Sequence, residues 1–296
     1  MPFISVIIPT RNRYEILKGA VDSVLAQTCT DYDLIVVDDG STDDTPLIEE
    51  EYRGRLKYIR QKHAGVSAAR NHGILVSSSP WIAFLDSDDL WMPDKLWVHC
   101  EYLESLNREE RIHQVDEIWI RNGRRVNPGK RHAKRGGWIF SDSLHLCLVS
   151  PSATIMHRTL LEETGGFDEK LPACEDYDLW LRVSWKERIG YIPQYMVTRH
   201  GGHADQLSAK YKGMDRFRVY SICGLLRDHH DDMPAKYVLD STQVAMEKLV
   251  ILQQGAERRK NDYLAETVRK VQKDITAGNY NSTAYQDLLE ELTDPA

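Results

Sequence analysis

The stretch Trp81–Asp88, Trp-Ile-Ala-Phe-Leu-Asp-Ser-Asp, joins an apolar run to two carboxylates, and a third, Asp89, follows directly. A short apolar run that ends in polar residues is typical of a buried strand. In an open α/β sheet, ligands bind beyond the carboxyl ends of the strands. Carboxylates crowded at such a position repel one another unless a cation or hydrogen-bond donors neutralise them. Oxygen ligands of this kind suit Mg²⁺ or Mn²⁺.

An alternative is that these acidic residues only precede a helix, which is expected to begin near Pro93. For an isolated pair of aspartates this alternative would be preferred. Three further polar clusters at the ends of expected strands and helices reverse the preference.

The first hundred residues alternate between strand and helix signals. We expect strands at Phe3–Ile8, Leu34–Val37, Leu56–Ile59 and Trp81–Leu85, and helices at Tyr14–Ala26, from Ser41–Thr45 to about Tyr52, and at Gly65–Val76. Strands separated by helices imply right-handed crossovers and a mostly parallel sheet. The sequence therefore predicts an α/β fold, with a mostly parallel mixed sheet flanked by helices.

The pattern changes after residue 93. We expect a helix at Asp94–Asn107, a hairpin at Glu117–Val126 with a type I′ turn at Asn122–Gly123, a strand at Ser152–Met156 and a helix at Tyr177–Ser184. After about Leu207 the strand signals disappear, and Asp240 with Gln243 resembles a capping box ahead of a helix. We therefore expect a domain over residues 1–207 and a helical appendage over 208–296. For the appendage, packing on the first domain, oligomerisation and partner binding all stay open.

Composition and charge limit the classes of function. The net charge of −7 over 296 residues argues against general nucleic-acid binding. No apolar run approaches the ~20 residues that span a bilayer, and the N-terminus lacks the basic region of a signal peptide. We expect a cytoplasmic protein, with peripheral attachment at the inner membrane face left open. The five cysteines form no C-x-x-C pair, so neither a zinc site nor a disulfide framework is indicated.

Four polar clusters lie at the ends of expected elements: Pro9–Asn12, Asp38–Ser41, Asp86–Asp88 and Glu175–Asp178. If the strands that precede the first three belong to one parallel sheet, those three clusters meet at one edge of it. This edge is where doubly wound sheets bind nucleotides. The chain has no G-x-G-x-x-G after the first strand and no G-x-x-x-x-G-K-[ST], which disfavours a nicotinamide or flavin site and excludes a P-loop.

Six segments together resemble family 2 of the glycosyltransferases, in matching order and spacing over roughly residues 3–207. They are Ser5–Arg13, Val36–Asp43, Gly65–Asn71, Phe84–Asp89, Gly165–Asp168 and Glu175–Arg182. The resemblance implies the GT-A fold, a divalent metal (Mn²⁺ or Mg²⁺), a nucleotide-diphosphate sugar as donor and inversion at the anomeric carbon.

The resemblance also implies roles for individual residues on the donor side. Asp39 matches the carboxylate that contacts the nucleotide base, and Asp88 matches the metal ligand. The remaining matches are Thr10 and Arg11 in the loop that borders the base, Arg70 near the nucleotide, Asp86 at the ribose or the metal shell with Ser87 beside it, and His203 near the diphosphate, with His200 as a close competitor.

Asp176 matches the catalytic base of the family. An acceptor hydroxyl needs a carboxylate to take its proton during attack, and a single inverting displacement needs only one such base. Glu175 and Asp178 compete for this role. The alternative is that these carboxylates only favour the start of a helix.

Several alternatives stay open at this stage. A non-catalytic sugar-nucleotide-binding module is the main rival function, and an aspartyl-phosphate phosphohydrolase is a second. The segment Arg121–Arg135 has seven Lys or Arg and no acid, and it is either a solvated loop or a lid over the diphosphate or an anionic acceptor. A UDP-sugar is the plainest donor for a hexosyltransferase-like enzyme of cell-surface polysaccharide synthesis. The acceptor is a glycan, a lipid-linked glycan or a protein.

Overall fold

The protein is described by a computed structural model, which covers residues 2–105, 110–127, 129–202, 211 and 213–289. These residues form two compact units. The sheet unit comprises Met1–Trp138, Leu148–Pro172 and Glu187–His203, and the helical unit comprises Ile139–Cys147, Ala173–Lys186 and Ala204–Ala296. No described helix is both long and apolar enough to cross a membrane.

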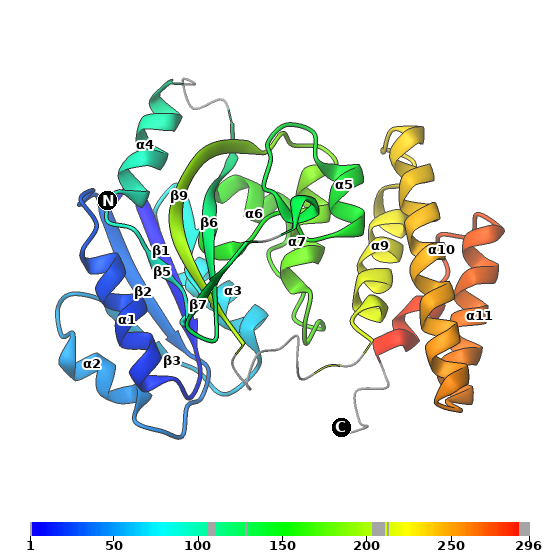
Figure 1. The fold of residues 1–296 in the computed structure, drawn as a ribbon, viewed down its shortest axis with the longest axis horizontal. Coiled ribbons are helices and arrows are strands. Elements are labelled where there is room, and N and C mark those ends of the chain that lie inside the picture. Colours follow the sequence, from blue (N-terminus) through cyan, green and yellow to red (C-terminus); the bar gives the residue numbers. More distant parts are fainter. Residues whose placement is uncertain (1, 106–109, 128, 203–210, 212, 290–296) are drawn as a thin grey trace. The chain divides into compact units, whose positions relative to one another are not determined.

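The sheet unit is built on one mixed sheet (Figure 1). Its strands are β1 Ile4–Thr10, β2 Tyr32–Asp38, β3 Lys57–Arg60, β4 Trp81–Phe84, β5 Leu90–Trp91, β6 Ile112–Arg121, β7 Arg124–Val126, β8 Thr154–His157 and β9 Gly190–Gly201. The described strands lie in the order β3-β2-β1-β4-β8-β6-β9-β5, with β7 paired to β6. The first four run parallel, and β8 runs antiparallel to both neighbours. This arrangement confirms the predicted α/β class and the parallel first half.

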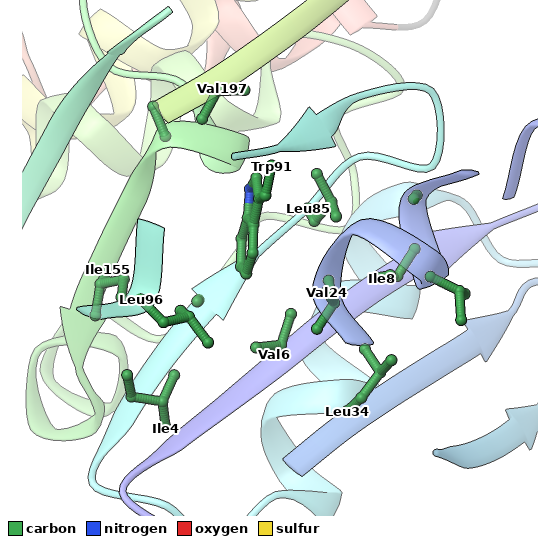
Figure 2. Packing of buried hydrophobic residues seen from close by; sticks show 14 of the residues in the cluster. Ile4, Val6, Ile8, Val24, Leu34, Leu85, Trp91, Leu96, Ile155 and Val197 are labelled. Atoms are coloured by element: carbon green, nitrogen blue, oxygen red, sulfur yellow. The ribbon is translucent and has the colours of Figure 1, made fainter. Parts of the chain in front are cut away.

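One face of the parallel strands is covered by helix α1, Tyr14–Leu25 (Figure 1). Alternate residues of a strand point to the same face. Ile4, Val6 and Ile8 of β1 therefore pack with Val24 of α1 in one buried cluster, which Figure 2 shows together with Trp91. Burying such a side chain contributes roughly 1.5–3 kcal/mol. The core thus fixes β1 and α1, and with them the loop that joins them.

The other face is covered by helix α3, Val66–Val76. Its Gly73 lies directly against Ile7 of β1, because a Cβ built on Gly73 would come within 2.4 Å of Ile7 Cγ2. The remaining helices of this unit are α2 Ile48–Glu51, α4 Lys95–Ser105 and α6 Arg158–Thr164, with 3-10 turns at Thr45–Leu47, Lys130–His132 and Pro151–Ala153. Of the helix expected at Asp94–Asn107, residues 106 and 107 lie outside the described residues.

The second half of the sheet contains the long parallel pair of β6 and β9 and the hairpin of β6 and β7. The hairpin confirms the prediction, since Asn122 and Gly123 have φ angles of 50° and 72°, as a type I′ turn requires. Strand β9 was not predicted. Its residues include Pro193 and many polar side chains, so they lack the apolar run by which the other strands are recognised.

The helical unit contains α5 Phe140–His145, α7 Glu175–Ser184, α9 Asp215–His229, α10 Ala235–Arg258 and α11 Asp262–Thr276, with a 3-10 segment at Ala284–Leu289. Helices after residue 207 are confirmed, but α5 and α7 belong to the same unit, so the boundary expected at residue 207 stays a prediction. The capping box expected at Asp240 is wrong. Helix α10 begins at Ala235, and Asp240 lies inside it, where its carboxylate accepts hydrogen bonds from Lys236 and Ser141.

Candidate functional site

The three polar clusters that follow β1, β2 and β4 meet at one edge of the sheet. Strand β1 lies between β2 and β4 and runs parallel to both, with Thr10 paired to Asp38 and Ile7 paired to Phe84. The backbone N–H of Asp39 donates to the carbonyl of Thr10 over 2.9 Å. The predicted convergence of the clusters is therefore confirmed, and we call this edge the carboxylate rim.

Asp39 lies almost fully buried at the rim, where its carboxylate gathers the loop that follows β3. Oδ1 accepts hydrogen bonds from Gln61 Nε2 and the Ala64 N–H, and Oδ2 accepts one from the Gly65 N–H, each over 2.8 Å. His63 Nδ1 lies 2.7 Å from Oδ2. A carboxylate offers about four acceptor positions, so Asp39 holds this loop with nearly all of its capacity.

The neighbouring Asp38 has a different environment. It is fully buried, and its carboxylate accepts hydrogen bonds from the Ser41 N–H and the Tyr58 hydroxyl. Burial and this hydrogen bond raise the pKa of Tyr58. Arg60 Nε lies 3.4 Å from the same carboxylate. Asp38 therefore shapes the turn after β2, and Asp39 shapes the next loop.

Asp86 is paired with the buried Arg70 of α3. Arg70 Nη2 donates to Asp86 Oδ1 over 2.7 Å, and the exposed fractions of the two side chains are 3% and 28%. The Arg70 guanidinium also stacks over the ring of Phe167, 5.0 Å from its centroid. Because Arg is always charged, this buried guanidinium holds the Asp86 carboxylate in place at the rim. The match of Arg70 to a residue near the nucleotide stays a prediction.

Arg13 lies next to Asp88 and Ser87, although the sequence alone predicted no role for it. Its Nη1 lies 3.1 Å from Asp88 Oδ2 and 3.2 Å from Ser87 Oγ. The guanidinium therefore places a positive charge beside the predicted metal ligand. The only signal in the sequence was the position of Arg13 in the first matched segment, three residues after Thr10.

Asp89 and His200 connect the rim to β9. Asp89 Oδ1 accepts from the His200 N–H over 3.0 Å, and Oδ2 accepts from Ser152 Oγ over 2.6 Å. Burial raises the pKa of Asp89 well above its usual range, although Arg199 opposes this. His200 Nδ1 lies 3.0 Å from the Asp88 carbonyl oxygen. His203, the residue that the resemblance matched to the diphosphate, lies outside the described residues, so its role stays a prediction.

Thr10 and Arg11 differ in their surroundings. The Thr10 hydroxyl is buried at the rim and has no hydrogen-bond partner among the described residues. A buried hydroxyl without a partner is costly, which fits a ligand that completes it. Arg11 is exposed, so its side chain is available at the surface of the same loop.

Asp176 belongs to the helical unit, in the first turn of α7. Its Oδ1 accepts a hydrogen bond from the N–H of Tyr177 over 2.7 Å, and Cys147 Sγ lies 3.6 Å from Oδ2. The competing Glu175 and Asp178 are each only 6% exposed, and Asp178 accepts from both Nε and Nη2 of Arg182. These contacts favour Asp176 as the most accessible of the three carboxylates.

The residues of the rim fit a divalent metal that is shared with a ligand. Within the described residues, no group of three or more His, Cys, Asp or Glu side chains could hold a metal ion. Mg²⁺ commonly binds through one or two carboxylates together with substrate phosphates. Asp88, and Asp86 two residues before it, supply that number of carboxylates on one short loop.

The comparisons with known proteins agree with this arrangement. The sequence profile of Glycosyl transferase family 2 matches residues 5–164. An uncharacterized glycosyltransferase of Rickettsia conorii is 33% identical over 196 residues, 64% of this chain and 31% of that protein. Another, of Rickettsia prowazekii, is 30% identical over 69% of this chain and 65% of its own length. The chondroitin synthase of Escherichia coli is 28% identical over 74% of this chain and 32% of the synthase.

These curated relatives are matched over about a third to two thirds of their own length. Among solved structures, S. aureus TarS 1–349 in complex with UDP-GlcNAc has a TM-score of 0.65 at 20% identity, over 98% of this chain and 91% of that 1–349 chain. A mannosyltransferase of Pyrobaculum calidifontis in complex with GDP-Man and Mn²⁺ has a TM-score of 0.57 at 17% identity, over 99% of this chain and 88% of that one. At these identities the likeness concerns the fold alone, and it supports the predicted GT-A architecture. Since the family profile matches more than half of the sequence, the chain belongs to glycosyl transferase family 2.

Proposed function

We propose that this chain is a metal-dependent inverting glycosyltransferase, which moves a hexosyl group from a nucleotide-diphosphate sugar to an acceptor hydroxyl. The observation that carries the proposal is the convergence of Asp39, Asp86 and Asp88 at one edge of a parallel sheet. Arg70 and Arg13 are paired with two of these carboxylates. Membership of the family supports transfer chemistry at this rim.

The base of the donor would lie between the loop of Thr10 and Arg11 and the loop that Asp39 holds. The unpartnered Thr10 hydroxyl is available to a ligand there. Because the four contacts of the Asp39 carboxylate are all to the loop of Gln61–Gly65, which follows β3, we propose that Asp39 contributes to base binding chiefly by shaping that loop. A UDP-sugar is the donor that we favour, because TarS, a structural neighbour, is described in complex with UDP-GlcNAc.

The diphosphate and the sugar would meet the loop of Asp86, Ser87 and Asp88. Asp88 would hold the metal, with Asp86 at its shell, and His203 or the neighbouring His200 would lie near the phosphates. A bound Mg²⁺ or Mn²⁺ supplies neutralisation of the charge that develops on the leaving diphosphate. The hydrogen-bonded ion pair with Arg70 fixes the position of the Asp86 side chain for this purpose.

Asp176 would take the proton of the acceptor hydroxyl. Positioned general bases contribute ~10²–10⁴ in rate, and an inverting displacement needs one such group. The greater burial of Glu175 and Asp178 supports Asp176 for this role. The acceptor class is a glycan, a lipid-linked glycan or a protein, in keeping with synthesis of a surface polysaccharide.

The first test is a thermal-shift panel of nucleotide-sugars, with and without Mn²⁺. A donor present at 100 times its Kd stabilises the folded protein by about 2.7 kcal/mol, so the true donor should raise Tm only when the metal is present. A panel that includes UDP- and GDP-sugars also identifies the base. If no nucleotide-sugar shifts Tm, the proposal is wrong.

The second test is the release of nucleoside diphosphate, with water or a supplied glycan as acceptor. We expect Asp176→Asn to bind the donor like the parent protein but to release product ~10²–10⁴ times more slowly. Asp94→Asn, which changes an exposed carboxylate, is the matched control. Donor binding without turnover in the parent protein would instead favour the non-catalytic binding module.

A further inference from the structure

The hairpin of β6 and β7 carries a row of cations next to an indole ring. Arg121 and Arg124 are paired directly across the hairpin, and Trp119 is paired with Arg199 of β9. Paired residues and residues two apart on a strand share one face of the sheet. We call the face formed by Trp119, Arg121, Arg124 and Arg199 the hairpin face.

The direct pairing of Arg121 with Arg124 is unfavourable by itself, because like charges directly opposite one another destabilise a hairpin. Both side chains are exposed, and no carboxylate of the described residues forms an ion pair with either of them. The protein as a whole carries a net charge of −7, so this cluster of positive charge is local. Charge of one sign gathered on one face attracts ligands of the opposite sign.

At the end of the hairpin face away from the turn, the charges are already paired. Glu117 is buried two residues before Trp119, and Lys134 Nζ lies 3.4 Å from its Oε1. Although burial alone would raise the pKa of Glu117, Lys134 and Arg199 hold it below its usual value. Lys134 therefore ties the end of the basic segment to the sheet and is itself compensated. The uncompensated cations are those near the turn.

Trp119 adds a flat apolar surface to this charge. Its ring is half-buried, lies 5.6 Å from the Arg199 guanidinium and packs edge-on against His132. Guanidinium groups bind carboxylates and phosphates with two parallel hydrogen bonds, and the faces of aromatic rings pack against the apolar faces of sugar rings. Together these groups suit a sugar chain that carries anionic groups.

We propose that the hairpin face binds an acidic glycan, and that the acceptor of the transfer reaction is of this class. This second part rests on the proposed function. His200, next to Arg199, contacts the Asp88 carbonyl oxygen, so β9 connects the hairpin face to the carboxylate rim. A membrane surface is the weaker candidate. None of the four residues of the hairpin face is an exposed large apolar side chain that could enter a bilayer, and the exposed Trp138 and Tyr195 do not belong to this face.

The test is the binding of the full chain to oligogalacturonate, which carries carboxylates, and to phosphorylated dextran, which carries phosphates, with plain dextran as the neutral control. We expect at least one acidic chain to bind and plain dextran not to bind. The double variant Arg121→Gln/Arg124→Gln should raise the Kd for that chain about tenfold. The double variant Arg269→Gln/Lys270→Gln removes the same charge from the exposed side of α11 and should leave the Kd unchanged.

Three results would overturn the inference. One is an unchanged Kd in the Arg121→Gln/Arg124→Gln variant, and another is binding to vesicles of anionic lipid without binding to either acidic glycan. The third is a loss of UDP affinity in that variant without a loss of glycan affinity, because the two cations would then serve the donor phosphates. Nucleotide binding separates the two proposals. A parent protein that binds UDP with Mn²⁺ but no acidic glycan contradicts only this inference. One that binds the glycan but no nucleotide contradicts the proposed function, and with it the acceptor class, but leaves glycan binding at the hairpin face standing.

Discussion

The carboxylate rim and the hairpin face differ in how their charges are compensated. At the rim, Asp86 and Asp88 each have a guanidinium partner, Arg70 and Arg13, at 2.7 Å and 3.1 Å. On the hairpin face, Arg121 and Arg124 lie opposite each other with no carboxylate of the described residues between them. The charges at the rim are therefore balanced before a ligand binds. Those of the hairpin face are balanced only when an anionic ligand binds.

The difference indicates how each region would respond to a ligand. A metal that binds at the rim has to compete with a cation that is already there, so binding is tuned by that cation. A polyanion at the hairpin face instead relieves the repulsion between like charges.

A third region of the molecule deals with positive charge in a different way. Lys95 and the pair His99 and His113 are fully buried, and burial lowers the pKa of each, so burial itself disfavours their charged forms.

Removing the charge of Asp88 should weaken donor binding at the rim more than any other change considered below. In Asp88→Asn we expect Mn²⁺-dependent donor binding to weaken at least about 100-fold, or about 2.7 kcal/mol, because the proposed metal loses its ionised ligand. Isothermal titration with UDP in the presence and absence of Mn²⁺ measures this change. Asp94→Asn serves as the control. Donor affinity that stays at the level of the parent protein would exclude Asp88 as the metal ligand.

Removing the charge of Asp39 tests whether this carboxylate holds the loop of Gln61–Gly65 in place. Asn at this position keeps the shape but replaces one acceptor oxygen by a donor, which leaves two of the four partners of Asp39 without an acceptor. We expect a loss of about 2 kcal/mol in the free energy of unfolding, measured by urea denaturation without ligand. An unfolding free energy equal to that of the parent would mean that the loop of Gln61–Gly65 does not depend on Asp39.

The buried histidines should make the stability of the folded protein depend on pH. The pKa of His113 is lowered from 6.5 to about 3, because burial disfavours the charged ring. The unfolded chain therefore binds more protons than the folded protein between pH 6.5 and pH 3, and stability falls as the pH drops through this window. Between pH 7 and pH 5 we expect a loss of about 2 kcal/mol from His113, measured by denaturation at both pH values.

The variant for this test replaces both rings. His99 Nδ1 and His113 Nδ1 lie 2.7 Å apart, so His99→Leu/His113→Leu removes both partners together and should flatten the pH dependence. His145→Gln changes an exposed ring and should leave the dependence as it is in the parent. A double variant that loses stability toward pH 5 as steeply as the parent would contradict the assignment.

The smallest expected effect concerns Arg13. Because the metal has to displace the ion pair of Arg13 with Asp88, Arg13→Gln should bind Mn²⁺ about fivefold more tightly without nucleotide. This corresponds to about 1 kcal/mol, the upper end of what ion pairs near the surface contribute, since both side chains of this pair are only partly exposed. Arg53→Gln, which breaks the exposed pair with Glu50, is the control. Weaker binding of Mn²⁺ by Arg13→Gln would mean that Arg13 supports the metal site and does not compete with it.

The parts of the fold that the sequence predicted are those that one local pattern specifies. The apolar runs of β1, β2 and β4 and the helical spacing of α1 each reflect a buried face. The polar clusters could be placed at one edge because parallel strands align their carboxyl ends. The Asn122–Gly123 turn followed from the positive φ angles that those two residues tolerate.

The parts that the sequence did not predict depend on partners far along the chain. Arg13 and Asp88 are 75 positions apart, and neither residue shows by itself which side chain it will meet. Strand β9 is stabilised by its pairing with β6, and its own sequence is weakly apolar. The apolar residues of α7, Leu179, Leu181 and Val183, are too mixed in spacing to define one face, and the structure buries residues all round this helix within the helical unit.

Gly73 has a consequence for how firmly the rim is held. With backbone instead of a side chain against Ile7, α3 lies as near to β1 as packing permits, and protein interiors at this density compress very little. Arg70 lies on the same helix, three residues earlier, and its buried guanidinium is held beside Asp86 by the position of the helix and by its packing on Phe167. The pair is thus stiff before any ligand binds, so little reorganisation is needed when charge develops beside it.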